Sequence, residues 1–281
     1  MGVLTIETLA FALALWLGLY LISRDPANPR LRFAGLGLVA YALGLAGGIL
    51  AAAGPAPPLA ATVARLRWPL PFLPALLWTG AVIQPLPEGS PQRASLAKLW
   101  RGGIGPAALL VLVLGAGTGL VFDPVTGRSR PGPALIALAL ATLLPLLAAT
   151  LLLWRSLERP RSRGATGAIL VALLFFVLST VLLLVPLGPL PRGPVIFLLG
   201  SDLIMLVAAI AALDALDAGE TLLPDLARSF DASFVAATIF GGQVALVVAL
   251  GTGPTFAMLA LLLGTIAAAI AMQVFADRLG G

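Results

Sequence analysis

The chain has 281 residues, of which 60% are hydrophobic and only 10% charged, and it contains no histidine and no cysteine. This composition, with a mean hydropathy of +1.06, excludes a water-soluble fold and predicts an integral membrane protein. The formal charge of +5 comes mostly from arginines in short breaks between apolar runs. Arginines at such positions orient a membrane protein, so this role explains the positive charge better than nucleic-acid binding does.

Apolar stretches of about 20 residues, the length that crosses a hydrocarbon core of roughly 30 Å, follow one another along the chain. They predict an all-α bundle of about nine spans, near 3–22, 33–53, 68–87, 103–122, 133–154, 166–186, 194–216, 233–251 and 255–275. Prolines crowd both ends of the third stretch, so we expect a short or broken helix there. Trp78, away from the ends of that stretch, is expected to pack inside the bundle.

Basic residues predict the orientation, because short loops that carry arginine resist translocation across the membrane. Alternate connections place Arg24, Arg30, Arg32, Arg93, Lys98, Arg101, Arg155, Arg159, Arg161, Arg163, Arg228 and Arg278 on one side, and Arg65, Arg67, Arg128, Arg130 and Arg192 on the other. The richer side is expected to be the cytoplasm of a bacterial inner membrane, which puts the N-terminus outside and the C-terminus inside. Only Glu7 is charged before the first run, which is typical of a retained span and not of a cleaved signal.

Three regions follow from this pattern. Residues 1–217 form a seven-span bundle, 218–232 form an acidic and amphipathic cytoplasmic connection, and 233–281 form a transmembrane hairpin with a short cytoplasmic tail. Small-residue spacing at Gly44 and Gly48 predicts close approach between helices.

Several kinds of membrane chemistry are disfavoured by residue content. Without histidine or cysteine the chain lacks the usual ligands of haem and of thiolate or imidazole metal sites, so no cofactor and no metal are expected. Lys98 is expected in a polar loop between the third and fourth spans, which excludes a retinal Schiff base within a span.

A carboxylate at membrane depth is costly unless it faces protein or water, and Asp202 is the clearest example here. It lies roughly 12 Å into the seventh predicted span at 1.5 Å per residue. We consider Asp202, Ser201 and Gln243 as candidate ligand-binding residues. The alternatives are structural: a protonated or hydrogen-bonded acid at position 202, and an interhelical hydrogen bond from Gln243.

The stretch that follows the seventh span is acidic, and its carboxylates recur at about three-residue spacing on one helix face. The candidate partner-coupling residues are Asp214, Asp217, Glu220, Asp225 and Arg228. A solvated linker is the alternative interpretation, and the spacing does not fit a calcium-binding loop.

Three segments carry a family resemblance: 17–24 (LGLYLISR), 67–71 (RWPLP) and 212–220 (ALDALDAGE). Together they resemble the N-terminal seven-transmembrane sensor region of bacterial histidine kinases and related regulators, over about residues 1–220. The resemblance implies a sensor body. The chain departs from this family in two ways. It has two further predicted spans, and it contains no histidine, so it cannot carry the phosphoacceptor histidine of such a kinase. Signalling would therefore pass through a partner.

The sequence thus favours a non-enzymatic sensor or receptor that passes a membrane or small-molecule signal to a cytoplasmic protein. The expected partners are the lipid bilayer and other membrane or cytoplasmic subunits, with no nucleic acid. Two alternatives stay open: a structural or anchoring subunit of a larger membrane complex, and a permease for a lipophilic substrate. Neither a histidine-containing triad nor a paired-carboxylate site can be assembled within the spans, so an enzyme is not expected.

Overall fold

The computed structural model describes residues 2–54, 59, 62–63, 70, 72–84, 86, 91–118, 120–123, 130–155, 231, 235, 238–239, 242, 246 and 255–279. Within these ranges the chain is helical, and five helices are long and apolar enough to cross a membrane. The chain is therefore a multi-pass helical membrane protein, which confirms the all-α, multi-pass part of the predicted fold class; the number of nine spans stays a prediction.

The first two helices form an antiparallel hairpin. α1 (Gly2–Arg24) and α2 (Pro29–Ala52) are joined by a turn in which Asp25 accepts hydrogen bonds from the backbone N–H groups of Ala27 and Asn28, at 3.0 and 3.2 Å. Asn28 then caps α2 by accepting from the N–H of Arg30 at 3.0 Å. Pro29 suits the first helical turn, where a missing N–H loses no intrahelical bond.

The third predicted span is a short helix, as its prolines indicate. α4 (Phe72–Ile83) has 12 residues, or about 18 Å of helix, too little to cross a bilayer by itself. Trp78 in this helix is fully buried, which confirms the prediction that it packs inside the bundle.

The fourth predicted span begins earlier than expected. α5 (Pro91–Leu99), a π-helical turn (Trp100–Ile104, called the π turn below) and α6 (Gly105–Gly117) run on without a break. The prediction that Lys98 lies in a loop is therefore wrong, because Lys98 is in the last turn of α5. A hydropathy pattern detects the apolar part of a helix and does not detect a polar extension of the same helix.

A short antiparallel hairpin follows α6, although the sequence shows no clear strand pattern there. β1 (Phe122–Asp123) pairs with β2 (Arg130–Pro131), with Phe122 opposite Pro131. α7 (Leu135–Arg155) and α11 (Phe256–Leu279) match the fifth and ninth predicted spans within a few residues. The predicted spans 166–186 and 194–216 lie outside the described residues, as does most of 233–251.

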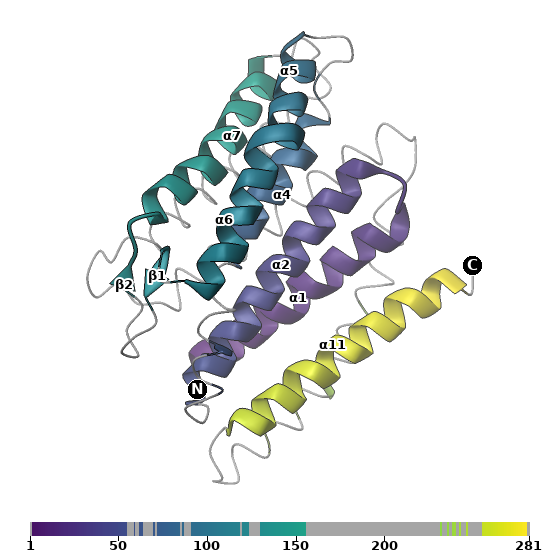
Figure 1. The fold of residues 1–281 in the computed structure, drawn as a ribbon. Helices are drawn as coiled ribbons and strands as arrows, with labels where there is room; N and C mark the ends of the chain where they lie inside the picture. The colour runs from purple at the N-terminus through teal and green to yellow at the C-terminus, as the bar shows by residue number, and fades with distance from the viewer. Residues whose placement is uncertain are drawn as a thin grey trace.

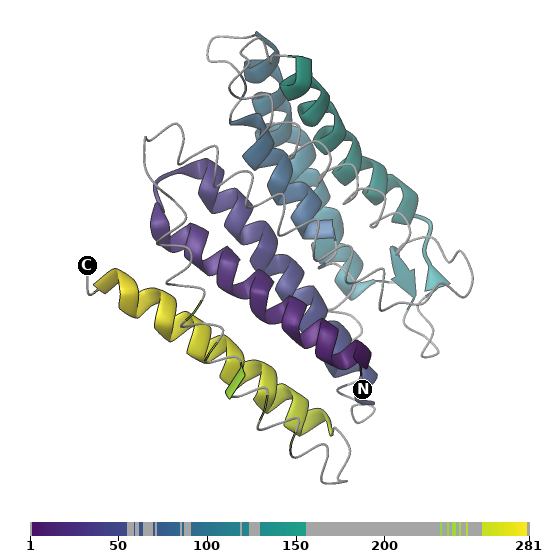
Figure 2. The ribbon, with the colours of Figure 1, turned by 180° about the vertical axis from the view of Figure 1, so that it is seen from behind.

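The helices lie side by side, with α1 between α2 and α11, and α4 between α2 and α7 (Figure 1; Figure 2 from behind). α1, α4, α7 and α11 run in one direction, whereas α2 and the α5–α6 helix run back. The ends that carry Arg24, Arg30, Lys98 and Arg155 consequently gather at one end of the bundle, called the basic end below. The C-terminus lies at the basic end and the N-terminus at the opposite end.

Glycine packing brings α1 and α2 together, but not at the predicted positions. A Cβ on Gly18 would lie 2.8 Å from the carbonyl oxygen of Gly35, so the two backbones touch. Among the described residues, the nearest neighbour of a Cβ added at Gly44 is a Leu70 side-chain atom at 3.5 Å, and none lies within 4 Å of one added at Gly48. The described residues therefore do not show the close approach predicted at Gly44 and Gly48, which stays a prediction for the rest of the chain.

Candidate functional site

The residues that the sequence suggested for ligand binding and partner coupling cannot be placed. They all lie outside the described residues: Ser201, Asp202, Asp214, Asp217, Glu220, Asp225, Arg228 and Gln243. Their roles stay predictions. In the part of the chain that is described, no group of three or more histidine, cysteine, aspartate or glutamate residues could hold a metal ion.

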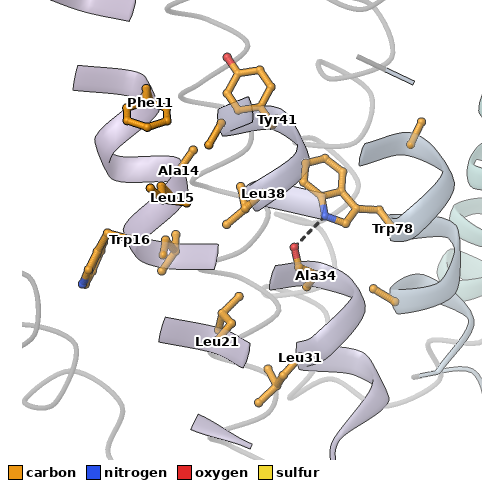
Figure 3. Packing of buried hydrophobic residues seen from close by; sticks show 14 of the residues in the cluster. Phe11, Ala14, Leu15, Trp16, Leu21, Leu31, Ala34, Leu38, Tyr41 and Trp78 are labelled. Atoms are coloured by element: carbon orange, nitrogen blue, oxygen red, sulfur yellow. Dashed lines mark hydrogen bonds between the residues drawn. The ribbon is translucent and has the colours of Figure 1, made fainter. Parts of the chain in front are cut away.

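Two tryptophans pack against α2 in the described bundle, and they differ in one respect. The first, Trp78 of α4, donates its indole N–H to the carbonyl oxygen of Ala34 in α2 at 3.1 Å (Figure 3). Gly37 makes room for this indole, because a Cβ at that position would overlap Nε1 of Trp78. Trp78 is thus a satisfied structural contact between α2 and α4.

The second tryptophan, Trp100, opens the π turn near the basic end. Its indole nitrogen Nε1 is buried, and it has no hydrogen-bond partner among the residues that the structure describes. A buried donor without an acceptor costs about 1–3 kcal/mol. A buried donor of this kind in a folded protein usually has a specific cause, such as a bound ligand or water or a second conformation.

The surroundings of Trp100 are aromatic and close. Its indole meets the Phe33 ring edge to face, with ring centroids 5.3 Å apart and an interplanar angle of 88°. The guanidinium carbon of Arg32 lies 5.8 Å from the centroid of the same Phe33 ring. On α4, a Cβ at Gly80 would lie 2.9 Å from a Trp100 ring carbon. We call these four residues, Arg32, Phe33, Gly80 and Trp100, the Trp100 cluster.

The local sequence explains why the helix widens here. The backbone N–H of Gly105 bonds to the carbonyl of Trp100, five residues back, and a Cβ at Gly105 would lie 2.6 Å from that carbonyl oxygen. Gly102 and Gly103 lie in the same turn, and neither would bring an added Cβ closer than 3.8 Å to another group. Such π turns usually hold one extra residue in an α-helix and are frequent at functional sites.

Chemically, the Trp100 cluster offers a hydrogen-bond donor in a low-dielectric setting, an aromatic wall and a nearby cation. It contains no nucleophile and no general acid or base, so it suits binding or conformational change and not covalent chemistry. In the sequence, Trp100 stands just before the fourth predicted span, 103–122. The available signal was the run Gly102, Gly103 and Gly105 directly after it, since clustered glycine in an apolar helix marks an irregular backbone.

Comparison with protein-family models, with curated proteins and with solved structures finds no match to this chain.

Proposed function

We propose that this protein is a non-enzymatic sensor or receptor of the bacterial inner membrane, with nine spans, that passes a signal from within the bundle to a cytoplasmic protein. The proposal includes the sequence-based orientation, with the N-terminus outside and the basic end in the cytoplasm. It also keeps the resemblance to the seven-transmembrane sensor regions of bacterial histidine kinases.

The number of spans is supported by where the described helices begin and end. α7 ends at the basic end. α11 begins at the opposite end and runs back to the basic end (Figure 1). A chain that leaves one end and re-enters from the other needs an odd number of crossings between them. The three spans predicted between residues 156 and 254 satisfy that requirement.

The orientation is supported by the segregation of charge. Helix ends that carry Arg24, Arg32, Lys98 and Arg155 share the basic end, as alternating connections require. Positively charged residues of short loops favour the cytoplasmic side. With the basic end inside, the acidic candidates Asp214, Asp217 and Glu220 would be on the side where a cytoplasmic partner could reach them.

The sensor role rests on one observation: the indole N–H of Trp100, the first residue of the π turn, is buried and has no hydrogen-bond partner among the described residues. A sensor needs two arrangements of its helices that differ in ligand affinity. A π turn can shift its hydrogen-bond register, and an unpaired donor gains energy from any arrangement or ligand that supplies an acceptor. At the other buried side-chain nitrogen and oxygen atoms of the described residues a hydrogen-bond partner is present, as at the indole N–H of Trp78.

One observation favours the second candidate, a structural subunit of a larger complex. The α5–α6 helix is only 11% buried over its candidate span, against 33–50% for the other long helices. Leu109, Leu110 and Val113 of α6 are largely exposed, and a neighbouring subunit would bury them.

The two candidates separate on purification of the full chain from native membranes in mild detergent, followed by mass spectrometry. A sensor should stay folded by itself and retain a cytoplasmic protein that is lost in the triple variant Asp214→Asn, Asp217→Asn and Glu220→Gln. Asp25→Asn is the matched control, because asparagine can still accept the turn hydrogen bonds made at that position. Recovery of integral membrane proteins at fixed stoichiometry, without which the chain aggregates, would support the subunit role instead.

A further inference from the structure

α5 is a polar helix that continues directly from a membrane span. From Pro91 to Gly117 the α5–α6 helix is about 40 Å long at 1.5 Å per residue, whereas the hydrocarbon core is roughly 30 Å thick. α6 is strongly apolar, so the excess length is α5, at the basic end. With α6 in the hydrocarbon core, α5 is expected to lie in the headgroup layer.

The two faces of α5 and the π turn differ. One stripe is half-buried against the bundle: Arg93, Leu96, Ala97, Trp100 and Ile104. Arg93 is engaged there, because its guanidinium donates to the carbonyl oxygen of Leu86 at 3.1 Å. The opposite face is exposed and carries Lys98 and Arg101.

Lys98 and Arg101 form a pair of cations on this outward face. Residues three apart on a helix have Cβ atoms about 5–6 Å from each other, so both side chains can reach one phosphate group. Neither makes an ion pair with another described residue. Gly102, next to Arg101, has open space where a side chain would be, so a phosphate can approach closely.

We propose that the outward face of α5 and the π turn, through Lys98 and Arg101, binds the phosphate headgroup of an acidic phospholipid. Basic residues placed at the membrane surface attract anionic lipids. A lipid fits better than a soluble anion because the surface changes from charged to apolar along the helix. Leu99 is 53% exposed beside the two cations, and α6 continues with exposed Leu110 and Val113, along which acyl chains can run.

The test is the thermal unfolding of the full chain in neutral detergent, titrated with phosphatidylglycerol or with phosphatidylcholine. A ligand that binds only the folded state stabilises it by RT ln(1 + [L]/Kd), so Tm rises with the ligand concentration relative to Kd. We expect a rise with phosphatidylglycerol only. At about 1 kcal/mol per surface cation, Arg101→Gln should weaken the apparent affinity about fivefold, and the double variant Lys98→Gln, Arg101→Gln about 30-fold. The charge-preserving variant Lys98→Arg, Arg101→Lys should keep most of the affinity.

Arg155→Gln is the matched control, since Arg155 is an exposed cation at the same end, on α7. It should weaken the apparent affinity less than Arg101→Gln does, because Arg155 lies on a different helix from the two cations of the proposed site. If Arg155→Gln weakens binding as much as Arg101→Gln, the attraction is diffuse and the proposal fails. A Tm rise of equal size with inorganic phosphate alone would also overturn it, because the anion would then not be a lipid.

Discussion

Two tryptophans on neighbouring helices of one bundle illustrate how a hydrogen bond separates a structural residue from a candidate functional one. The indole N–H of Trp78 finds the carbonyl oxygen of Ala34, whereas that of Trp100 is buried without an acceptor among the described residues. No sequence pattern shows which of the two indole N–H groups finds an acceptor. The difference depends on which α2 atoms face each ring, and this is decided by tertiary packing.

Replacing each tryptophan with phenylalanine tests this difference. Trp78→Phe removes a made hydrogen bond, worth about 0.6 kcal/mol on average within membranes, and leaves a cavity in a fully buried site. Trp100→Phe removes a donor whose burial costs about 1–3 kcal/mol, which offsets the lost packing. We expect Trp100→Phe to change the free energy of unfolding by less than about 1 kcal/mol, and Trp78→Phe to lower it by more. Equal losses in thermal unfolding would show that the Trp100 N–H is satisfied.

Gly37 should be the least replaceable glycine of α2. A Cβ at this position would overlap the Trp78 indole, and overpacking of this kind costs about 1–3 kcal/mol. Gly48→Ala in the same helix is the control, because it has open space and alanine favours a helix by up to about 1 kcal/mol. Thermal unfolding should therefore show a lower Tm for Gly37→Ala and an unchanged or higher Tm for Gly48→Ala. Equal Tm values for the two variants would contradict the described packing of α2 against α4.

Among the elements, helix existence could be predicted and helix length could not. The first, second, fifth and ninth predicted spans correspond to α1, α2, α7 and α11 because each is a continuous apolar run bounded by polar or proline-containing turns. The polar helix α5 was not predicted. Hydropathy indicates which segments are buried in lipid, whereas a helix is formed by backbone hydrogen bonds that polar segments can also make. The π turn escaped for the same reason, and the predicted site around Asp202 is not tested by the described residues.

The π turn predicts an asymmetry between two single-residue deletions. Because such a turn holds one extra residue, deleting Gly102 should restore a plain α-helix and keep α5 and α6 in register with the bundle. Deleting Leu110 in regular α6 should instead rotate the following residues by about 100°, moving buried Leu112 off its packing face. Folded yield and Tm in detergent should stay near wild type for the first deletion and collapse for the second. The reverse order would show that the widened turn is not an insertion.

For the whole molecule, the distribution of charge agrees with the directions in which the helices run. The helix ends rich in arginine gather at the basic end, and the hairpin between α6 and α7 lies at the other end with the N-terminus (Figures 1 and 2). This alternation could be predicted from the sequence because each short connection carries its own charge bias. Which end faces the cytoplasm decides where a partner could bind, and the proposed sensor role and the acidic coupling stretch both depend on it.

Cysteine labelling of spheroplasts measures that orientation directly, since the natural chain contains no cysteine to interfere. Ala27→Cys places a thiol in the exposed turn between α1 and α2 at the basic end, and Thr118→Cys places one after α6 at the opposite end. With the basic end in the cytoplasm, a membrane-impermeant maleimide should label Thr118→Cys in intact spheroplasts and Ala27→Cys only after permeabilisation. Labelling of Ala27→Cys from outside, with Thr118→Cys protected, would contradict it.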